Sequence, residues 1–344
     1  MSNSPIASLF GEPEDSYYKF MGFGPHTRLS LFMLFKHKAL FFAHKNVLND
    51  PTDCTPYLNN DLNDEEAADH IRAMLAKNHN LSAYMKSSAE AALEAFNRSI
   101  SSSTSDQKGL LGSGILGTLS SPKDFITAYM KERFADARIF SMSKTWNEPR
   151  MWSHYASSHT GFCLELTGFT NRPTGMLLDR VDYTTRRPTV LATEVCALAV
   201  KEGRDLEHQV YNRSYLQKSV GWQYEQEYRL ILPAQKLKNE ISILSLPEGA
   251  YVHLPNLQIK SITLGLNSSK QDQRLIQDSY FQFLEDEPHP VIWKIVQPAD
   301  SFDIERVSWE DPRNSDRLYI AWTEALTDFT KSGAPKKSAK NSRK

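Results

Sequence analysis

The chain has 344 residues, of which 40% are hydrophobic and 24% are charged. This composition is ordinary for a folded protein with a real core, and it excludes a largely disordered or fibrous chain. The 40 basic and 41 acidic side chains nearly cancel. A strong overall field that recruits nucleic acid or an anionic membrane is therefore excluded, and any such contact must be local.

The three cysteines, Cys54, Cys163 and Cys196, are scattered and include no Cys-x-x-Cys pair. They predict neither a disulfide framework nor a zinc site, and no metal is expected. The longest apolar stretch, from Leu29 to Phe35, is too short to span a bilayer, and no basic region precedes an apolar segment at the N-terminus. We therefore expect a cytoplasmic protein with reduced thiols and no contact with a membrane.

The first part of the chain predicts a strand, a helix and a second strand. Strands are expected at Tyr17–Phe20 and Ala39–Ala43, on either side of a helix from Thr27 to Phe35. The sequence Asn49-Asp50-Pro51 then predicts a turn, because Asn and Asp close local side-chain hydrogen bonds and Pro fixes φ.

Residues from about 57 to 135 differ in composition and predict a helical insertion. Apolar spacing predicts helices at Asp64–Lys77, Ala83–Ile100 and Pro122–Phe134. The connection between the last two is rich in Gly, Leu and Ser and predicts a mobile loop. Within it, Gly112–Gly117 matches Gly-x-Gly-x-x-Gly, but no strand leads into it and no helix clearly opens at it. A flexible connection is therefore favoured over a nucleotide cradle.

The second half of the chain predicts strands and helices in a mixed order. Strands are expected at Arg138–Ser143, Gly161–Leu166, Arg180–Tyr183, Glu227–Leu232, Tyr251–Leu254, Ile259–Leu264 and Val291–Val296. Helices are expected at Asn147–Tyr155, at Thr193–Val220 with a break near Gly203, and at Ser268–Leu284. Because strands and helices do not alternate regularly, we predict an α+β fold with a mixed central sheet.

The chain is expected to form one domain over residues 1–334, which ends in a C-terminal helix from Asp316 to Phe329. Residues 335–344 predict a disordered basic tail.

The most informative stretch is Trp222–Arg229, which places Glu225 and Glu227 two residues apart before an apolar run. In an extended strand both carboxylates share one face. Two like charges at so short a distance raise the pKa of one of the two carboxyl groups. Such a pair supplies a proton acceptor or a partner for a developing cation. The alternative is a solvated charged stripe, completed by Arg229, in front of an apolar inner face.

Two further groups of residues carry chemistry of their own. Ser141 and Ser143 share one face of a predicted strand and are suited to orient a sugar or a phosphate, although surface hydroxyls on strands are common. His154 precedes Tyr155 on a predicted helix, where an imidazole is suited to act as an acid or base, and the alternative is a purely structural histidine. Cys163 lies between apolar residues without an activating base, which favours a buried inert thiol.

Five motifs in chain order resemble a bacterial family known only as domain of unknown function 2971. They are Asn49-Asp50-Pro51, Ser141-Met142-Ser143, Met151–Ala156 running into Gly161–Leu164, Trp222–Arg229 and Ile262–Gly265. The resemblance covers roughly residues 17–300. It implies a bacterial cytoplasmic protein and supplies no activity.

A second resemblance is to the ADP-ribosyltransferase fold. One large class has a basic residue on the first strand, a Ser-x-Ser on a later strand and a Glu-x-Glu entering another. This chain has Lys19, Ser141-Met142-Ser143 and Glu225-Gln226-Glu227 in that order. Lys19 stands where the class has arginine or histidine, and Met142 stands where threonine is usual.

The transferase resemblance implies that NAD is a substrate. Glu227 would stabilise the ribosyl oxocarbenium ion and bind the ribose hydroxyl, while Glu225 would orient or deprotonate the acceptor. Ser141 and Ser143 would order the strand under the nicotinamide ribose. The resemblance further implies nucleotide contacts from the aromatic residues near the motifs, namely Tyr18, His154, Tyr155 and Trp222. A Glu227→Gln substitution is then expected to abolish NAD consumption with little change in the thermal midpoint.

Two other functions fit parts of the sequence. A non-catalytic or nucleic-acid-associated module of a bacterial conflict or phage-defence system fits the basic tail Lys336–Lys344 and the spaced aromatics. A metal-dependent hydrolase would use four ligands, His44, Asp50, Asp53 and His154, although the two aspartates are equally suited to form turns. The sequence specifies neither the acceptor, protein or nucleic acid, nor the oligomeric state.

Overall fold

The computed structural model describes residues 15–77, 81–101, 121–134, 137–170, 172–173, 175–200, 204–233, 242–283 and 290–309. The expected glycine-rich connection, C-terminal helix and basic tail lie outside these residues. Among the helices that fall within them, none combines the length and the apolar character needed to cross a membrane.

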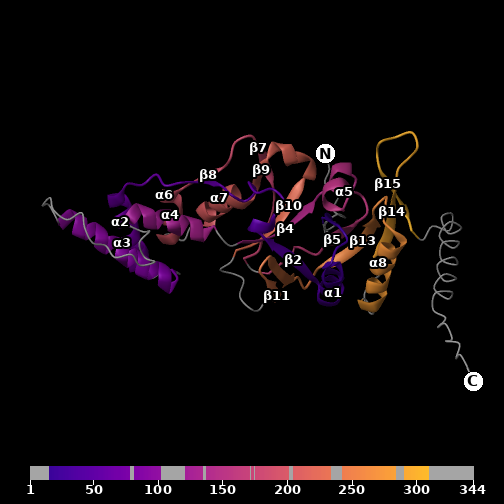
Figure 1. Cartoon of the computed structure of the whole chain (residues 1–344), viewed down its shortest axis with the longest axis horizontal. Helices are drawn as coiled ribbons and strands as arrows, with labels where there is room; N and C mark the ends of the chain where they lie inside the picture. Colours follow the sequence, from indigo (N-terminus) through magenta and orange to yellow (C-terminus); the bar gives the residue numbers. More distant parts are fainter. Residues whose placement is uncertain are drawn as a thin grey trace, which may run out of the picture.

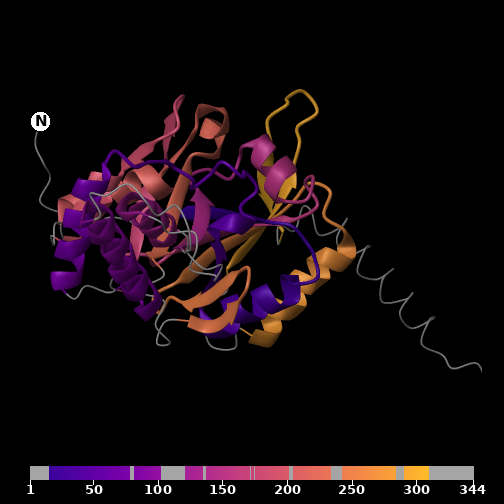
Figure 2. The same cartoon turned by 60° about the vertical axis from the view of Figure 1, so that its left-hand side comes forward.

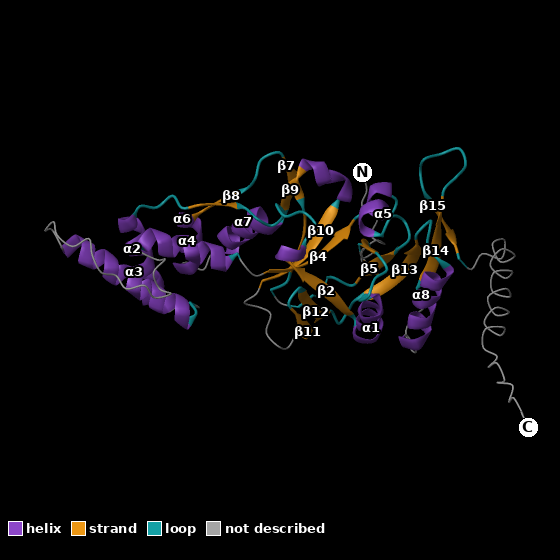
Figure 3. Cartoon of the chain, viewed as in Figure 1, coloured by secondary structure: helices purple, strands orange, loops and turns teal. Residues whose placement is uncertain are grey.

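A mixed sheet of eleven strands forms the centre of the described part of the chain (Figure 1, Figure 3). Its main path runs through β11 (Ser242–Leu246), β12 (Gly249–His253), β2 (Ala39–His44), β4 (Ala137–Ser143), β1 (Tyr17–Met21), β5 (Phe162–Thr167), β13 (Gln258–Leu264), β14 (Val291–Val296) and β15 (Glu305–Ser308). Off this path, β10 (Glu227–Pro233) pairs with β4 and with β6 (Leu177–Arg180). Within this sheet, as far as the structure describes it, β13 and β14 are the only parallel pair and are joined through α8 (Lys270–Phe283). The α+β prediction is confirmed.

Helices cover both faces of this sheet. On one face, α1 (Thr27–His37) and α8 lie side by side over a core that contains Phe140 and Leu230 (Figure 2). On the other face, α5 (Pro149–Tyr155) packs on residues of β1 and β5. Because side chains alternate along a strand, the neighbours Ile139 and Ile231 point away from the first core.

Ile139 and Ile231 belong to a second core, which the helical insertion covers. The insertion contains α2 (Asp64–Ala76), α3 (Ala83–Ser101) and α4 (Pro122–Arg133), close to the predicted bounds. Asn63 and Glu66 begin α2 with a reciprocal capping box. The helix predicted over Thr193–Val220 with a break near Gly203 is found as two helices, α6 (Ala192–Val200) and α7 (Arg204–Tyr215), which join the same layer at one end of the molecule (Figure 1). The second helix ends at Tyr215 and not at Val220.

Short elements connect these layers. Two small parallel sheets pair β3 (Tyr57–Asn59) with β8 (Thr189–Leu191) and β7 (Asp182–Thr184) with β9 (Gln217–Ser219). Two 3₁₀ helices, η1 (Lys45–Val47) and η2 (Val220–Glu225), follow β2 and β9. The predicted strand Arg180–Tyr183 is therefore divided between the end of β6 and β7.

The sheet opens next to the middle of β4. One edge of β4 is paired along its whole length with β10. On the other edge, β2 pairs only with Arg138 and Ile139, and β1 pairs only with Ser143. Within the described residues, the segment 140–142 therefore has no strand neighbour on this edge, and β1 and β2 diverge beside it.

Candidate functional site

A cavity of about 400 Å³ occupies the opening between β1 and β2. Its walls come from these two strands, β4, α1, the loop after η1 and the segment from β9 to β10. Residues expected from the sequence to form a site line it, namely Tyr18, Lys19, Ser141, Ser143, Tyr155, Glu225 and Glu227. His154 and Trp222 are not among the lining residues. The opening in the sheet thus gathers side chains from segments far apart in the sequence.

The sequence predicted that Glu225 and Glu227 share one face of a strand, and the structure shows that they do not. Glu225 ends η2, Gln226 has a left-handed backbone with φ of 45°, and Glu227 begins β10. The two carboxylates nevertheless converge on one ammonium group, because Lys218 Nζ lies 2.6 Å from Glu225 Oε2 and 3.2 Å from Glu227 Oε2. The solvated stripe is also wrong, since Glu225, Glu227 and Arg229 are all buried.

Glu227 is held by Arg229 in a bidentate ion pair. Arg229 Nε donates to Oε1 at 2.7 Å and Nη2 donates to Oε2 at 2.9 Å. The backbone N–H of Glu227 donates to the Tyr183 hydroxyl, and the Ser141 hydroxyl bonds the carboxylate. Burial alone would raise the pKa of Glu227, but the charges of Arg229 and Lys218 hold it well below its usual range. Glu227 is therefore ionised at neutral pH.

Glu225 has a different environment. The Tyr155 hydroxyl donates to Oε1 and Lys218 donates to Oε2. Burial raises the pKa of Glu225 and the nearby charge of Glu227 raises it further, while Lys218 opposes both effects. The two carboxylates of the motif thus have pKa values shifted in opposite directions.

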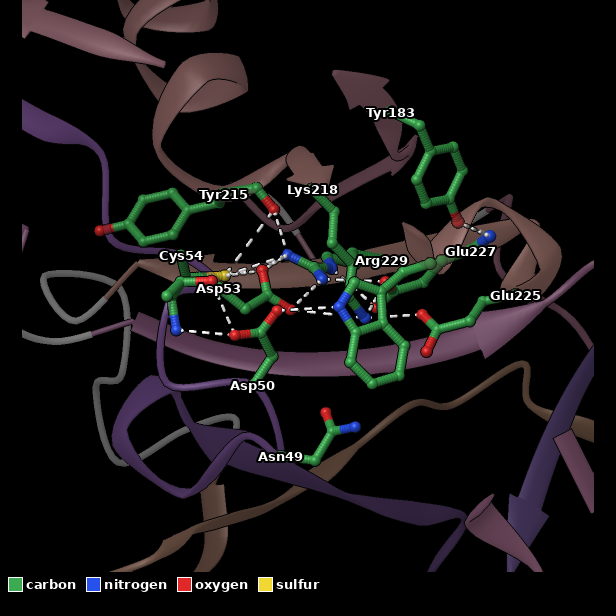
Figure 4. A network of polar contacts seen from close by, with 12 residues as sticks. Asn49, Asp50, Asp53, Cys54, Tyr183, Tyr215, Lys218, Glu225, Glu227 and Arg229 are labelled. Atoms are coloured by element: carbon green, nitrogen blue, oxygen red, sulfur yellow. Dashed lines mark hydrogen bonds and ion pairs between the residues drawn. The ribbon is translucent and has the colours of Figure 1, made fainter. Parts of the chain in front are cut away.

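Arg229 and Lys218 extend this arrangement to the loop after η1. Arg229 also makes a bidentate pair with Asp53, at 3.0 and 2.6 Å, and Lys218 Nζ lies 3.6 Å from Asp53 Oδ2. Figure 4 shows these side chains pointing toward one another from three separate segments. We define the charged cluster as Asp53, Lys218, Glu225, Glu227 and Arg229. The sequence did not indicate a role for Lys218. In the helix predicted as far as Val220, it would be an ordinary lysine exposed to solvent.

The Asn49-Asp50-Pro51 turn makes hydrogen bonds to side chains at and beside the same cavity. The Asn49 side-chain amide donates to the Tyr155 hydroxyl at 2.8 Å, and Trp222 Nε1 donates to Asp50 Oδ2 at 2.9 Å. Asp50 also accepts two hydrogen bonds from Thr52, as a turn-forming aspartate does. The turn therefore fixes the positions of Tyr155 and Trp222.

These contacts engage two of the four ligands that the hydrolase alternative would use. Asp53 is paired with Arg229, and Asp50 bonds Thr52 and Trp222. In the described part of the chain, no group of three or more His, Cys, Asp or Glu side chains is arranged to hold a metal ion.

Lys19, on β1, lines the same cavity. Its Nζ donates to the Ser141 carbonyl at 2.8 Å and sits 4.6 Å from the centre of the Phe140 ring. Burial lowers the pKa of Lys19 to about 8, although the charges of Glu227 and Glu225 act in the opposite direction. The carbonyl that Lys19 binds belongs to the edge of β4 left open between β1 and β2.

The two serines of β4 have separate partners. Ser143 donates to the Glu225 carbonyl at 2.7 Å and accepts from the backbone of Thr145, so its hydroxyl is used to hold the chain. Ser141 instead bonds the carboxylate of Glu227. Their shared strand face, predicted from the sequence, therefore supports both glutamates.

His154 and Trp222 belong to an aromatic group next to the cavity. The His154 ring lies 6.3 Å from that of Trp222 and 6.2 Å from that of Tyr224, and Arg150 stacks on Tyr224 at 4.2 Å. The His154 ring is also 6.3 Å from that of Tyr155, which does line the cavity. This group is adjacent to the site rather than a part of its wall.

Residues 151–230 match a protein family described as "Protein of unknown function (DUF2971)". This range is narrower than the resemblance over residues 17–300, and it contains Tyr155 and all of the charged cluster except Asp53. No curated protein and no solved structure matches the chain. The chain is thus similar, over the segment that carries both glutamates, to a family without an assigned function.

Proposed function

We propose that the protein is an ADP-ribosyltransferase-like enzyme that takes NAD into the cavity between β1 and β2. The observation that carries this proposal is the convergence of Lys19, Ser141, Glu225 and Glu227 on one cavity. These residues come from three strands and a 3₁₀ helix that are distant in sequence. They are also the residues on which the transferase resemblance rests.

The opposite pKa shifts of the two glutamates support two different roles. A pair of carboxylates whose environments separate their pKa values is a common source of acid and base functions in one site. Glu227 remains ionised and is held rigidly, which suits it to stabilise the positive charge that develops as the nicotinamide bond breaks. Glu225, with its raised pKa, is the group that accepts the proton of the attacking nucleophile.

Lys19 and Tyr155 complete the proposed site. Lys19 supplies a positive charge for the diphosphate of NAD. Tyr155 is anchored through its hydroxyl by Asn49 and Glu225, so its ring offers a fixed surface for a base. His154 and Trp222 contact the substrate only if it extends beyond the lining residues.

The test compares the wild type with Glu225→Gln. We expect calorimetry to detect NAD binding to both proteins, because the substitution removes a proton acceptor and keeps the shape of the side chain. NAD consumption followed by chromatography should fall by about 100-fold or more in the variant, as for loss of a general base. Absence of NAD binding to the wild type, or unchanged turnover in the variant, would overturn the proposal.

Glu165→Gln provides a matched control. Glu165 lies on β5, accepts hydrogen bonds from Ser16 and Ser261, and is not among the residues that line the cavity. This variant removes a partly buried carboxylate from the same sheet, and it should consume NAD at the wild-type rate.

A further inference from the structure

The side chain of Lys218 is nearly inaccessible to solvent, with 4% of its surface exposed. Its ammonium group contacts Glu225 at 2.6 Å and Glu227 at 3.2 Å and lies 3.6 Å from Asp53. The Trp222 ring covers the ammonium group at 5.0 Å. A buried lysine is costly to desolvate, and its carboxylate partners offset that cost.

We propose that Lys218 is a positioning residue, which sets the separation of the two glutamates and keeps Glu225 in the form that accepts a proton. The catalytic part of this inference rests on the proposed function. The structural part, the dependence of Glu225 on Lys218, does not require NAD.

Glu225 depends on the charge of Lys218 more than Glu227 and Asp53 do. Arg229 makes two hydrogen bonds to Glu227 and two to Asp53, so these carboxylates keep a cation if Lys218 is removed. Among the described residues, the carboxylate of Glu225 would retain only the neutral hydroxyl of Tyr155 as a donor. Its charge would then lie buried beside that of Glu227, which favours protonation.

The ionisable groups around Glu225 come from every element packed on it. They are Lys19 on β1, Asp53 after η1, Tyr155 on α5, Tyr183 on β7, Lys218 on β9, Tyr224 on η2 itself, and Glu227 with Arg229 on β10. Of the cations in this set, Lys218 alone lies within 4.0 Å of a Glu225 oxygen. Lys19 donates instead to the Ser141 carbonyl.

Lys218 also joins the segments that carry the two glutamates. It pairs with Tyr183 in the β7–β9 ladder, and the Tyr183 hydroxyl accepts the backbone N–H of Glu227. On its other side, η2 follows β9 directly and ends at Glu225. The ion pair between Lys218 and Glu225 therefore closes the turn that η2 forms.

The experiment measures the protonation of Glu225 directly. Protein labelled with ¹³C at glutamate carboxyl groups would be titrated by NMR, with Glu225→Gln used to assign the resonance. We expect the apparent pKa of Glu225 to rise by about one unit or more in Lys218→Met, as for loss of a close opposite charge. Lys218→Arg should restore it, and Lys294→Met, which removes a lysine remote from the cluster, should leave it unchanged.

Turnover supplies the second readout. If the enzyme consumes NAD, the acidic limb of its pH profile should move upward by the same amount in Lys218→Met and return in Lys218→Arg. If Lys218→Met does not fold, Lys218→Gln replaces it in both measurements, with the same expected direction.

The outcomes separate the two proposals. An unchanged Glu225 titration in the folded Met or Gln variant overturns the role of Lys218, whatever the activity. A shifted titration in a protein that neither binds nor consumes NAD supports the structural dependence on Lys218 and overturns the proposed function. A shifted titration with an unshifted pH profile shows that Lys218 does not act through Glu225 in turnover.

Discussion

Glu227 and Arg229 form the ion pair on which the buried part of the site depends. Arg229 has no exposed surface, and Glu227 has 4%. Loss of one partner from a buried ion pair typically destabilises a protein by about 3–5 kcal/mol. Because Arg229 keeps Asp53 as a second partner, the lower end of this range applies to loss of Glu227. The expectation that Glu227→Gln leaves the thermal midpoint unchanged does not fit this environment, and Glu225→Gln is the cleaner probe of catalysis.

We therefore predict that Glu227→Gln lowers the free energy of unfolding by about 3 kcal/mol at neutral pH. In the folded protein the pKa of Glu227 lies below its ordinary value of 4.5. Its stabilising contribution is then complete above about pH 4.5 and is lost as the pH falls further. Urea unfolding of both proteins should show a difference that is largest near pH 7 and shrinks below about pH 4.5. A constant difference across this range would contradict the argument.

At the scale of single elements, the left-handed conformation of Gln226 determines how the two glutamates are presented. Its φ of 45° turns the chain between η2 and β10, and its side chain is exposed. Its carbonyl accepts the backbone N–H of Lys144, and its own N–H donates to the Gln223 carbonyl. The conformation is thus maintained by backbone contacts, and a substitution here tests the backbone alone.

We predict that Gln226→Val lowers the free energy of unfolding by about 1–2 kcal/mol, because a β-branched residue tolerates the left-handed region poorly. Gln226→Gly should fold with a stability within about 1 kcal/mol of the wild type, since glycine pays no Cβ penalty there. Denaturant unfolding of the two variants checks both values. Equal losses in the two would show that the side chain of Gln226, rather than its backbone, contributes.

Elements with local signals were predictable from the sequence. The helices of the insertion carry caps and apolar spacing, and α2 begins at Asn63 with its capping box. The short strands β3, β8 and β9 have three residues each and no periodicity of their own. Their pairing with distant segments decides their conformation, and the sequence does not display that pairing.

The sequence identified part of the site, namely the segment that carries the two glutamates, but neither its conformation nor its tertiary partners. The residue types and spacing around Glu225 and Glu227 identified the segment, because two carboxylates lie among aromatic residues and an arginine directly before an apolar run. The spacing did not reveal Gln226 as a turn, so the shared strand face was wrong. Lys218 and Asp53 join the glutamates only through tertiary contacts, and neither has a local signal of its role.

At the scale of the whole molecule, the cavity lies between two cores. One core is formed under α1 and α8, and the other lies under the helical insertion. β4 contributes to both, with Phe140 on one side and Ile139 on the other. Both residues also line the cavity, so the opening beside β4 reaches from one core toward the other.

The opening between β1 and β2 is therefore the feature whose loss should remove ligand binding without loss of the fold. Ala43 lies on β2 opposite Ile139, lines the cavity and is half-buried. Ala43→Phe would place a ring in this space, where added apolar contacts offset the cost of ordering the side chain. We expect its thermal midpoint to stay near that of the wild type while its NAD affinity falls by about 10-fold or more, the effect of about 1.4 kcal/mol. Ala43→Ser, which leaves the cavity open, is the matched control and should bind NAD as the wild type does. Equal affinity in Ala43→Phe and the wild type would show that NAD, if it binds, does so outside this opening.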